Sequence, residues 1–259
     1  MHHNLYQRSA QKNLPGIKVS QTIYFIPGTM CDQNLWLPVW QLLQEQCHED
    51  HQLISLVIPN TGCMDEVVSA LSDQVVAHKA ILVGFSLGGY IASAIALKLD
   101  KKLKHLLIVS NFPKNLPIAE MKQRKRTTDG ISQRGYFGIP DKRVDDLLHP
   151  EIKQLNRQGY QDVKQIIVAM DRALGVDVLL HQLRISLHRP NLLPSLTRLS
   201  LPITLLVGDT DNLVDLTSLK QELHGASHVV LKEIPDTGHM LPLESPQACA
   251  TMLIHLLAS

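Results

Sequence analysis

The sequence predicts an α/β fold in which a mostly parallel sheet is flanked by helices and carries an inserted helical cap. Short and almost wholly apolar runs, rich in β-branched residues and closed by turn-forming residues, recur along the chain. Such runs are typical of the buried strands of a parallel sheet, and the segments between them have helical spacing of apolar residues. One stretch, residues 113–195, is more polar and contains no run of this kind. We therefore expect one α/β core interrupted by a helical insertion.

Six segments have the composition of buried strands, and turn-forming residues follow several of them. The first stops at Pro27 and Gly28, and the second stops at Pro59. Apolar residues at helical spacing over residues 64–77, and an alanine-rich stretch over residues 90–99, predict two of the intervening helices. The predicted strands are residues 22–26, 53–58, 80–83, 103–110, 203–207 and 229–231, the last continuing to residue 234.

The same pattern divides the chain into a core and a cap. Residues 1–112 and 196–259 form the predicted core, and residues 113–195 form the predicted cap. Within the cap, residues 163–170 and 176–187 have the apolar spacing of helices. We therefore expect the cap to be helical.

Composition excludes several classes of protein. The 259 residues are 44% hydrophobic and 19% charged, as in a folded globular chain rather than a disordered one. A net charge of +1 and an aromatic content of 4% give no basis for binding nucleic acid. The first twenty residues do not read as a signal peptide and no apolar stretch reaches about 18 residues, so no stable membrane insertion is expected. Four cysteines without C-x-x-C spacing indicate reduced thiols, and we expect a cytoplasmic protein.

The segment Gly84-Phe85-Ser86-Leu87-Gly88 lies between a predicted buried strand and a predicted helix. A Gly-x-Ser-x-Gly sequence in this position is typical of a nucleophile held on a sharp strand-to-helix turn. The turn strains the central residue, so the positions two before and two after it must lack bulk. A tight turn with a capping serine would also account for the glycines, but the placement favours Ser86 as a nucleophile.

A serine nucleophile needs a base, and the base needs a third group to orient it. Three carboxylates, at Asp209, Asp211 and Asp215, follow the fifth predicted strand, and His239 follows the sixth. Serine, acid and then histidine is one of the chain orders in which such triads occur. Three further histidines lie in the predicted cap, at His149, His181 and His188.

Four segments in combination resemble the α/β-hydrolase superfamily, and more narrowly its small serine esterase and acyl-hydrolase branch, which includes pimeloyl-carrier-protein methyl ester esterases. The resemblance covers residues 20–112 and 196–257 and implies the α/β-hydrolase fold. It selects Asp211 as the acid of a Gly-x-x-Asp loop and His239, after Gly238, as the base. The segments that carry it are Ile26-Pro27-Gly28-Thr29, Gly84 to Tyr90, Gly208 to Val214 and Pro235 to Pro246.

The resemblance also implies an oxyanion hole made by the backbone N–H groups of Thr29 and Leu87, with Met30 as the fallback donor. Pro27 stands where many relatives have histidine, but the N–H that proline lacks is not the proposed donor. Many relatives begin their sheet with an antiparallel hairpin. Only residues 1–20 could supply it here, and we expect it to be truncated or absent.

Serine, acid and histidine together imply a serine carboxylic-ester hydrolase that forms an acyl-enzyme on Ser86. The expected substrate is a small-molecule ester, and the chemistry requires neither a metal nor an organic cofactor. Two alternatives stay open. The same triad could cleave a thioester or a carbon–carbon bond, or the chain could be a non-enzymatic ligand-binding protein on the same fold.

The run Lys122-Gln123-Arg124-Lys125-Arg126 gives the predicted cap a dense positive charge, with Arg134, Lys142 and Arg143 beyond it. An ordinary solvated helix face would account for this run. The alternative is a docking surface for an acidic acyl-carrier protein or for an acid-bearing substrate, as in the methyl ester esterases that the chain resembles.

Overall fold

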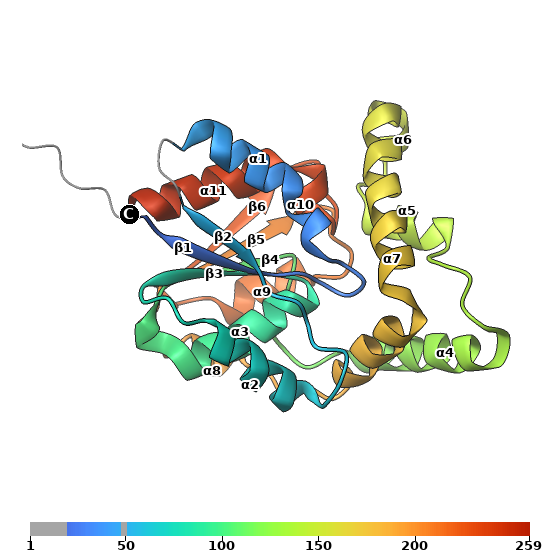
Figure 1. The fold of residues 1–259 in the computed structure, drawn as a ribbon, viewed down its shortest axis with the longest axis horizontal. Coiled ribbons are helices and arrows are strands. Elements are labelled where there is room, and N and C mark those ends of the chain that lie inside the picture. The colour runs from blue at the N-terminus through green and yellow to red at the C-terminus, as the bar shows by residue number, and fades with distance from the viewer. Residues whose placement is uncertain (1–19, 48–50) are drawn as a thin grey trace, which may run out of the picture.

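A parallel sheet of six strands forms the centre of the molecule (Figure 1). The structure is a computed structural model, and it describes residues 20–47 and 51–259. Neighbouring strands pair in parallel in the order β2-β1-β3-β4-β5-β6, which confirms the predicted α/β fold. The prediction about an N-terminal hairpin concerns residues 1–20, and residues 1–19 of this segment lie outside the described residues. The strands are β1 (Thr22–Ile26), β2 (Gln52–Ser55), β3 (Ala80–Phe85), β4 (Leu103–Val109), β5 (Ile203–Gly208) and β6 (Val229–Ile234).

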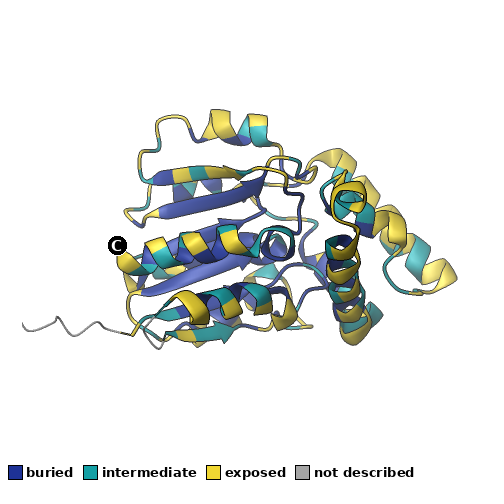
Figure 2. Cartoon of the chain, turned by 90° about the horizontal axis from the view of Figure 1, so that it is seen from above, coloured by how far each residue is buried: buried dark blue, intermediate teal, exposed yellow. Residues whose placement is uncertain are grey.

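The two faces of the sheet bury separate hydrophobic cores because side chains alternate along each strand. In β1, Tyr24 and Ile26 enter one core, and Ile23 and Phe25 enter the other. Figure 2 shows the buried strands lying between helices whose outer surfaces are exposed. The first core includes α2 (Met64–Gln74), α3 (Leu87–Leu99), α8 (Leu193–Leu196) and α9 (Leu216–Glu222); the second includes α1 (Leu37–Gln46), α10 (Leu241–Glu244) and α11 (Pro246–Ala258). Two short 3-10 helices adjoin these helices along the chain: η1 (Gln33–Leu35) precedes α1, and η2 (Asp100–Lys102) follows α3.

The second strand is shorter than the predicted residues 53–58. Its pairing with β1 ends at Ser55, opposite Phe25, because β1 itself ends before Pro27. The rest of the predicted strand continues as a loop that still buries Leu56. The apolar composition of this segment therefore reflects burial beyond the strand as well as within it.

The segment between β4 and β5, residues 110–202, is described throughout and contains no strand. Figure 1 shows four of its helices gathered at one end of the sheet: α4 (Ile118–Arg134), α5 (Asp141–Leu147), α6 (Ile152–Leu155) and α7 (Arg157–Ile185). Gly175, with a φ of 77°, separates α7 into two helical halves, which match the two helical patterns in the sequence. The boundary predicted at residue 195 falls inside α8, whose leucines pack in the first core, and the division into core and cap stays a prediction. Among the described residues, no helix is both long and apolar enough to cross a membrane.

The strand order reverses beside β1. The chain passes from β1 to β2 on one side and then returns to add β3 on the other side. In open parallel sheets, ligands bind beyond the carboxyl ends of the strands at such a reversal. The segments after β1 and β3 begin at Pro27 and Ser86. This end of the sheet therefore sets the predicted oxyanion turn beside the predicted nucleophile.

Candidate active site

Ser86 occupies a sharp turn between β3 and α3, and its φ is positive (φ 50°, ψ −118°). This is the strained turn that the glycine pattern predicts, and a non-glycine residue held in such a conformation costs roughly 1–3 kcal/mol. Helix α3 begins directly after it, at Leu87 rather than at the predicted Tyr90. A Cβ on Gly88 would lie 2.2 Å from the carbonyl oxygen of Ile26. The close approach of these two backbones explains why glycine follows the turn.

Ser86, His239 and Asp211 come together in one hydrogen-bonded series. His239 Nε2 lies 3.0 Å from Ser86 Oγ, and His239 Nδ1 lies 2.9 Å from Asp211 Oδ2. The histidine and the aspartate are each only 5% exposed. A carboxylate only accepts hydrogen bonds, so Nδ1 carries the proton and Nε2 is left to accept from the serine hydroxyl. The arrangement can take a proton from Ser86 when its oxygen attacks an electrophile.

The two other carboxylates of the loop after β5 have structural partners instead. Asp209 is exposed, and its Oδ1 accepts a hydrogen bond of 3.2 Å from the backbone N–H of Thr237. Asp215 is exposed at the N-terminus of α9, where its Oδ1 accepts from the backbone N–H of Ser218 at 3.0 Å. Hydrogen bonds from Ser218 hold the pKa of Asp215 below its ordinary value. Of the three candidates, only Asp211 meets His239.

The predicted oxyanion turn packs tightly against the nucleophile. A Cβ on Gly28 would lie 2.8 Å from the Phe85 ring and 3.0 Å from Ser86 Cβ. Thr29 lines the same cleft as Ser86. Leu87 is the first residue of α3, and the first four N–H groups of a helix have no partner within it. Both predicted donors therefore lie beside Ser86.

Met30, the predicted fallback donor, has another partner. Its N–H donates a buried hydrogen bond of 2.8 Å to Oε1 of Gln182 in α7. This N–H points to the predicted cap and is not free to bind an oxyanion. Thr29 therefore remains the predicted donor on this turn.

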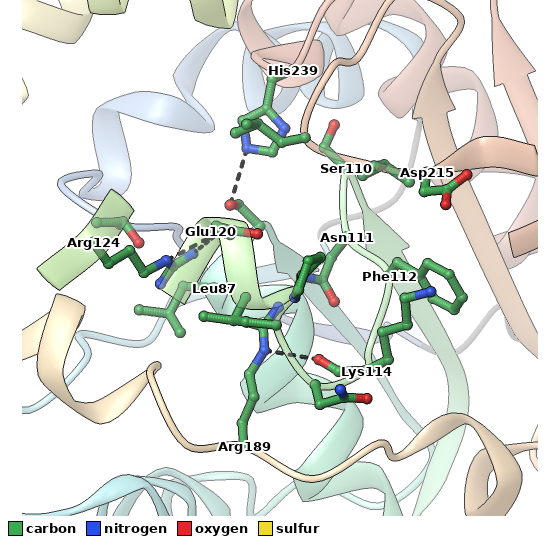
Figure 3. A pocket seen from close by; sticks show the side chains of 17 residues that line it. Leu87, Ser110, Asn111, Phe112, Lys114, Glu120, Arg124, Arg189, Asp215 and His239 are labelled. Carbon is green, nitrogen blue, oxygen red and sulfur yellow. Dashed lines mark hydrogen bonds and ion pairs between the residues drawn. The ribbon is translucent and has the colours of Figure 1, made fainter. Parts of the chain in front are cut away.

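Ser86 lies in the wall of an open cleft, beside Thr29, Leu87 and His239. Figure 3 shows the side chains that line it, with His239 on one side and Arg189 on the other. The segment after β4 supplies Ser110 and Asn111, and α4 supplies Glu120 and Arg124. Within the described residues, no group of three or more His, Cys, Asp or Glu side chains could hold a metal ion.

A sequence profile described as the Alpha/beta hydrolase family matches residues 23–252 of this chain. The match includes all six strands except the first residue of β1, together with the strained serine turn and the loops that carry Asp211 and His239. The chain belongs to the alpha/beta hydrolase family. This assignment agrees with the resemblance seen in the sequence.

Three proteins illustrate what this alpha/beta hydrolase is similar to. Monoacylglycerol lipase ABHD6 of Mus musculus is 20% identical over 286 residues, covering 100% of this chain and 81% of the mouse protein. A thermophilic esterase from Thermogutta terrifontis superposes with a TM-score of 0.75 at 19% identity, covering 92% of this chain and 90% of the esterase. The enol-lactonase from Burkholderia xenovorans LB400 also gives a TM-score of 0.75, at 13% identity, covering 93% of this chain and 92% of the lactonase. At these identities the structural matches establish the fold.

In this alpha/beta hydrolase, the loop that carries His239 is hydrogen-bonded to the last residue of α5. The backbone N–H of His239 donates to the carbonyl of Leu147 at 2.8 Å. Glu244 accepts from the backbone N–H groups of His149 at 2.6 Å and Gly238 at 3.3 Å. Burial raises the pKa of Glu244 despite these hydrogen bonds. The glutamate belongs to a motif of the resemblance, but nothing in the sequence indicated its partner near α5.

Proposed function

We propose that this protein is a serine hydrolase that cleaves a carboxylic ester through an acyl-enzyme on Ser86. One observation supports the proposal most strongly: Ser86, His239 and Asp211 form a hydrogen-bonded series at a strained turn that faces an open cleft. A base held by an orienting acid is what activates a serine hydroxyl. We assign Ser86 as nucleophile, His239 as general base and then general acid, and Asp211 as the group that orients the imidazole.

Each step follows from this assignment. Ser86 Oγ attacks the ester carbonyl carbon while its proton passes to His239 Nε2. The N–H groups of Thr29 and Leu87 stabilise the resulting oxyanion, and such a donor contributes roughly 3–4 kcal/mol in other hydrolases. The intermediate collapses, and the leaving alcohol takes the proton from His239. A water molecule, deprotonated by His239, then attacks the acyl group and releases the acid and free Ser86.

The names of three relatives support an ester as the substrate. The mouse protein is named a lipase and the Thermogutta protein an esterase, and the Burkholderia protein is named an enol-lactonase. The same residues could attack a thioester or a carbon–carbon bond, so the target bond needs a direct test. A non-enzymatic binder is disfavoured, because binding alone does not require a serine, a histidine and an aspartate in this arrangement.

The proposed function is tested with p-nitrophenyl esters of increasing acyl length, beside a thioester and a β-diketone of matched size. We expect ester hydrolysis with the highest kcat/KM for a small or medium acyl chain. Turnover restricted to the thioester or to the diketone would assign the same residues to another bond. Stoichiometric binding without turnover would identify a ligand-binding protein instead.

Gln182 provides a test of the oxyanion turn. In Gln182→Ala the buried N–H of Met30 loses its acceptor, and the turn that carries Thr29 loses this hydrogen bond to α7. We expect kcat for an ester to fall about tenfold with a smaller change in KM, because the Thr29 N–H acts on charge that develops only in the transition state. Steady-state kinetics and thermal unfolding measure the two effects separately.

Gln182→Glu is the matched variant, because it keeps an oxygen at the same reach. It is expected to restore most of the lost kcat. A Gln182→Ala variant with normal kcat and a lowered Tm would mean that Gln182 supports the fold but does not position the turn.

We propose that an acidic acyl-carrier protein docks on the outer face of α4. Lys122, Lys125 and Arg126 are exposed there, whereas Arg124 forms an ion pair of 2.6 Å with Glu120. The run that the sequence presents as one basic surface therefore divides between two faces of the helix. Three of its cations are exposed to a protein partner, although Lys125 also pairs with Asp129 at 3.1 Å, and Arg124 belongs to the cleft.

A further inference from the structure

Two arginines line the cleft beside Ser86, and they differ in their partners. Arg124 is neutralised by Glu120, which accepts hydrogen bonds from its Nη2 at 2.6 Å and from its Nε at 3.1 Å. Its Nη1 donates to the hydroxyl of Ser186. All three nitrogens of this guanidinium are occupied, so Arg124 is fixed as part of the wall.

Arg189 has no carboxylate partner among the described residues. Its Nε donates to the carbonyl of Lys114 at 2.9 Å, and its guanidinium lies over the Tyr90 ring, 4.7 Å from the ring centroid. Within the part of the chain that the structure describes, Nη1 and Nη2 make no hydrogen bond. Burial, and next the charge of Arg124, lower the pKa of Arg189 to about 10. A half-buried guanidinium whose Nη1 and Nη2 groups have no acceptor is stabilised by an anion that accepts two parallel N–H hydrogen bonds.

Two neutral polar groups in the same cleft also lack partners. Ser110 and Asn111 directly follow β4, and they are 1% and 6% exposed. Among the described residues, Ser110 Oγ and Asn111 Oδ1 are buried without a hydrogen bond. Buried polar atoms in folded proteins nearly always have a partner. Ser110 also has a positive φ of 50°, and strain of this kind gathers at ligand sites.

The charged groups that line the cleft indicate the charge of its ligand. The cleft is lined by three cations, Lys114, Arg124 and Arg189, and by two carboxylates outside the hydrogen-bonded series, Glu120 and Asp215. Glu120 neutralises Arg124, and Lys114 pairs with Glu222 at 3.5 Å. The carboxylate of Asp215 accepts from Ser218 at the exposed N-terminus of α9. Arg189 is the cation in the cleft of Ser86 that has no carboxylate partner among the described residues.

We propose that the substrate carries a free carboxylate besides its scissile ester, and that Arg189 binds this carboxylate with help from the hydroxyl of Ser110. The planar guanidinium matches the two oxygens of a carboxylate, and a serine hydroxyl can donate to the same oxygens. Asn111 Oδ1 only accepts hydrogen bonds, so it does not contribute to binding the carboxylate. The chemical class is a monoester of a small dicarboxylic acid, or a lactone that bears an acid. This inference rests on the proposed ester hydrolysis and adds the substrate class.

The test compares monomethyl adipate, which is anionic, with dimethyl adipate, which is neutral. Wild-type protein is expected to prefer the monoester in kcat/KM. In Arg189→Gln we expect this preference to fall about 10- to 100-fold, mainly through KM, since a charge-assisted hydrogen-bonded pair is lost. Arg189→Lys keeps the positive charge but lacks the planar guanidinium, so its preference for the monoester is expected to lie between those of the wild type and Arg189→Gln.

The matched control removes three cations from the outer face of α4 in one variant, Lys122→Gln/Lys125→Gln/Arg126→Gln. This variant is expected to keep the wild-type preference, because its charges lie outside the cleft. A loss of preference equal to that of Arg189→Gln would overturn the subsite and assign the effect to the general field of the cap.

A second measurement does not depend on any variant. Adipate should inhibit hydrolysis of the neutral diester by wild-type protein competitively, and adipamide, its neutral analogue, should inhibit far less. Equal inhibition by both, or a wild-type preference for the diester, would overturn the subsite and leave the hydrolase intact. Absence of turnover on either ester, with no labelling of Ser86 by a fluorophosphonate, would instead overturn the proposed function on which the subsite rests.

Discussion

Replacing Ser86 with alanine is expected to lower kcat for ester hydrolysis by roughly 10⁶-fold, by analogy with removal of the serine in another Ser-His-Asp enzyme. The variant lacks the Oγ that attacks the carbonyl, and His239 then has no hydroxyl to activate. The fold should persist, because alanine keeps the Cβ and removes only the side-chain bond to His239. Initial rates on a p-nitrophenyl ester, corrected for spontaneous hydrolysis, measure the loss, and thermal unfolding checks the fold.

Labelling identifies the residue directly. A fluorophosphonate should add one label to the wild-type protein, and peptide mapping should locate it on Ser86. Ser93→Ala is the matched control, because Ser93 lies on the same helix and donates to the carbonyl of Gly89 at 2.7 Å, away from His239. It is expected to keep full activity and labelling. A Ser86→Ala protein that labels at the wild-type rate would show that the nucleophile lies elsewhere.

The strands and the serine turn were predictable because their causes are local. A buried parallel strand needs a short apolar run, and the six predicted segments each overlap an observed strand. The turn at Ser86 needs glycine where the chain approaches another backbone, as Gly88 does. Both requirements, the apolar run and the glycine, can be recognised within a few residues of sequence. The pattern did not say where β2 ends, because Leu56 stays buried after the pairing stops.

The choice among the loop carboxylates depended on more than local pattern. Asp209, Asp211 and Asp215 share one loop, and the residues alone left all three as candidates. Resemblance to a family selected Asp211. The structure distinguishes them by burial and partners, since only Asp211 is buried against the histidine. Those properties depend on how β5 and β6 pair and not on the residues flanking each aspartate.

The contacts between the predicted cap and the site had no signal in the sequence. Gln182 and Met30 are 152 positions apart, and nothing near either residue indicates the other. The basic run is a different case, because helical periodicity sets Arg124 four residues after Glu120, on one face of α4. The composition of the run does not show this pair. Arg189 and Ser110, which form the proposed carboxylate subsite, lie far apart in the sequence and line one cleft only in the folded chain.

Asp211→Asn is expected to lower kcat by about 10⁴-fold, as replacement of the triad aspartate does in another serine hydrolase. The reason lies in the partners of the side chain. Asp211 Oδ1 accepts from the backbone N–H of Leu213 at 2.9 Å, so an asparagine would keep its oxygen there. Its NH₂ group would then face His239 Nδ1 and donate to it. The proton would move to Nε2, which could no longer accept the proton of Ser86.

Two variants of the same loop provide matched controls, because each makes the same change from carboxylate to amide. Asp209→Asn keeps an oxygen for the N–H of Thr237, and Asp215→Asn keeps a residue that caps helices well. Both side chains are exposed, and neither forms a hydrogen bond with His239 in the described structure, so we expect kcat to stay close to that of the wild type. Surface substitutions of this kind usually change the free energy of unfolding by less than about 0.5 kcal/mol. Kinetics on one ester and thermal unfolding of all three variants complete the comparison. If Asp209→Asn or Asp215→Asn lowered kcat more than Asp211→Asn at equal stability, the orienting acid would have to be reassigned, because hydrogen bonding to His239 would not then determine the rate.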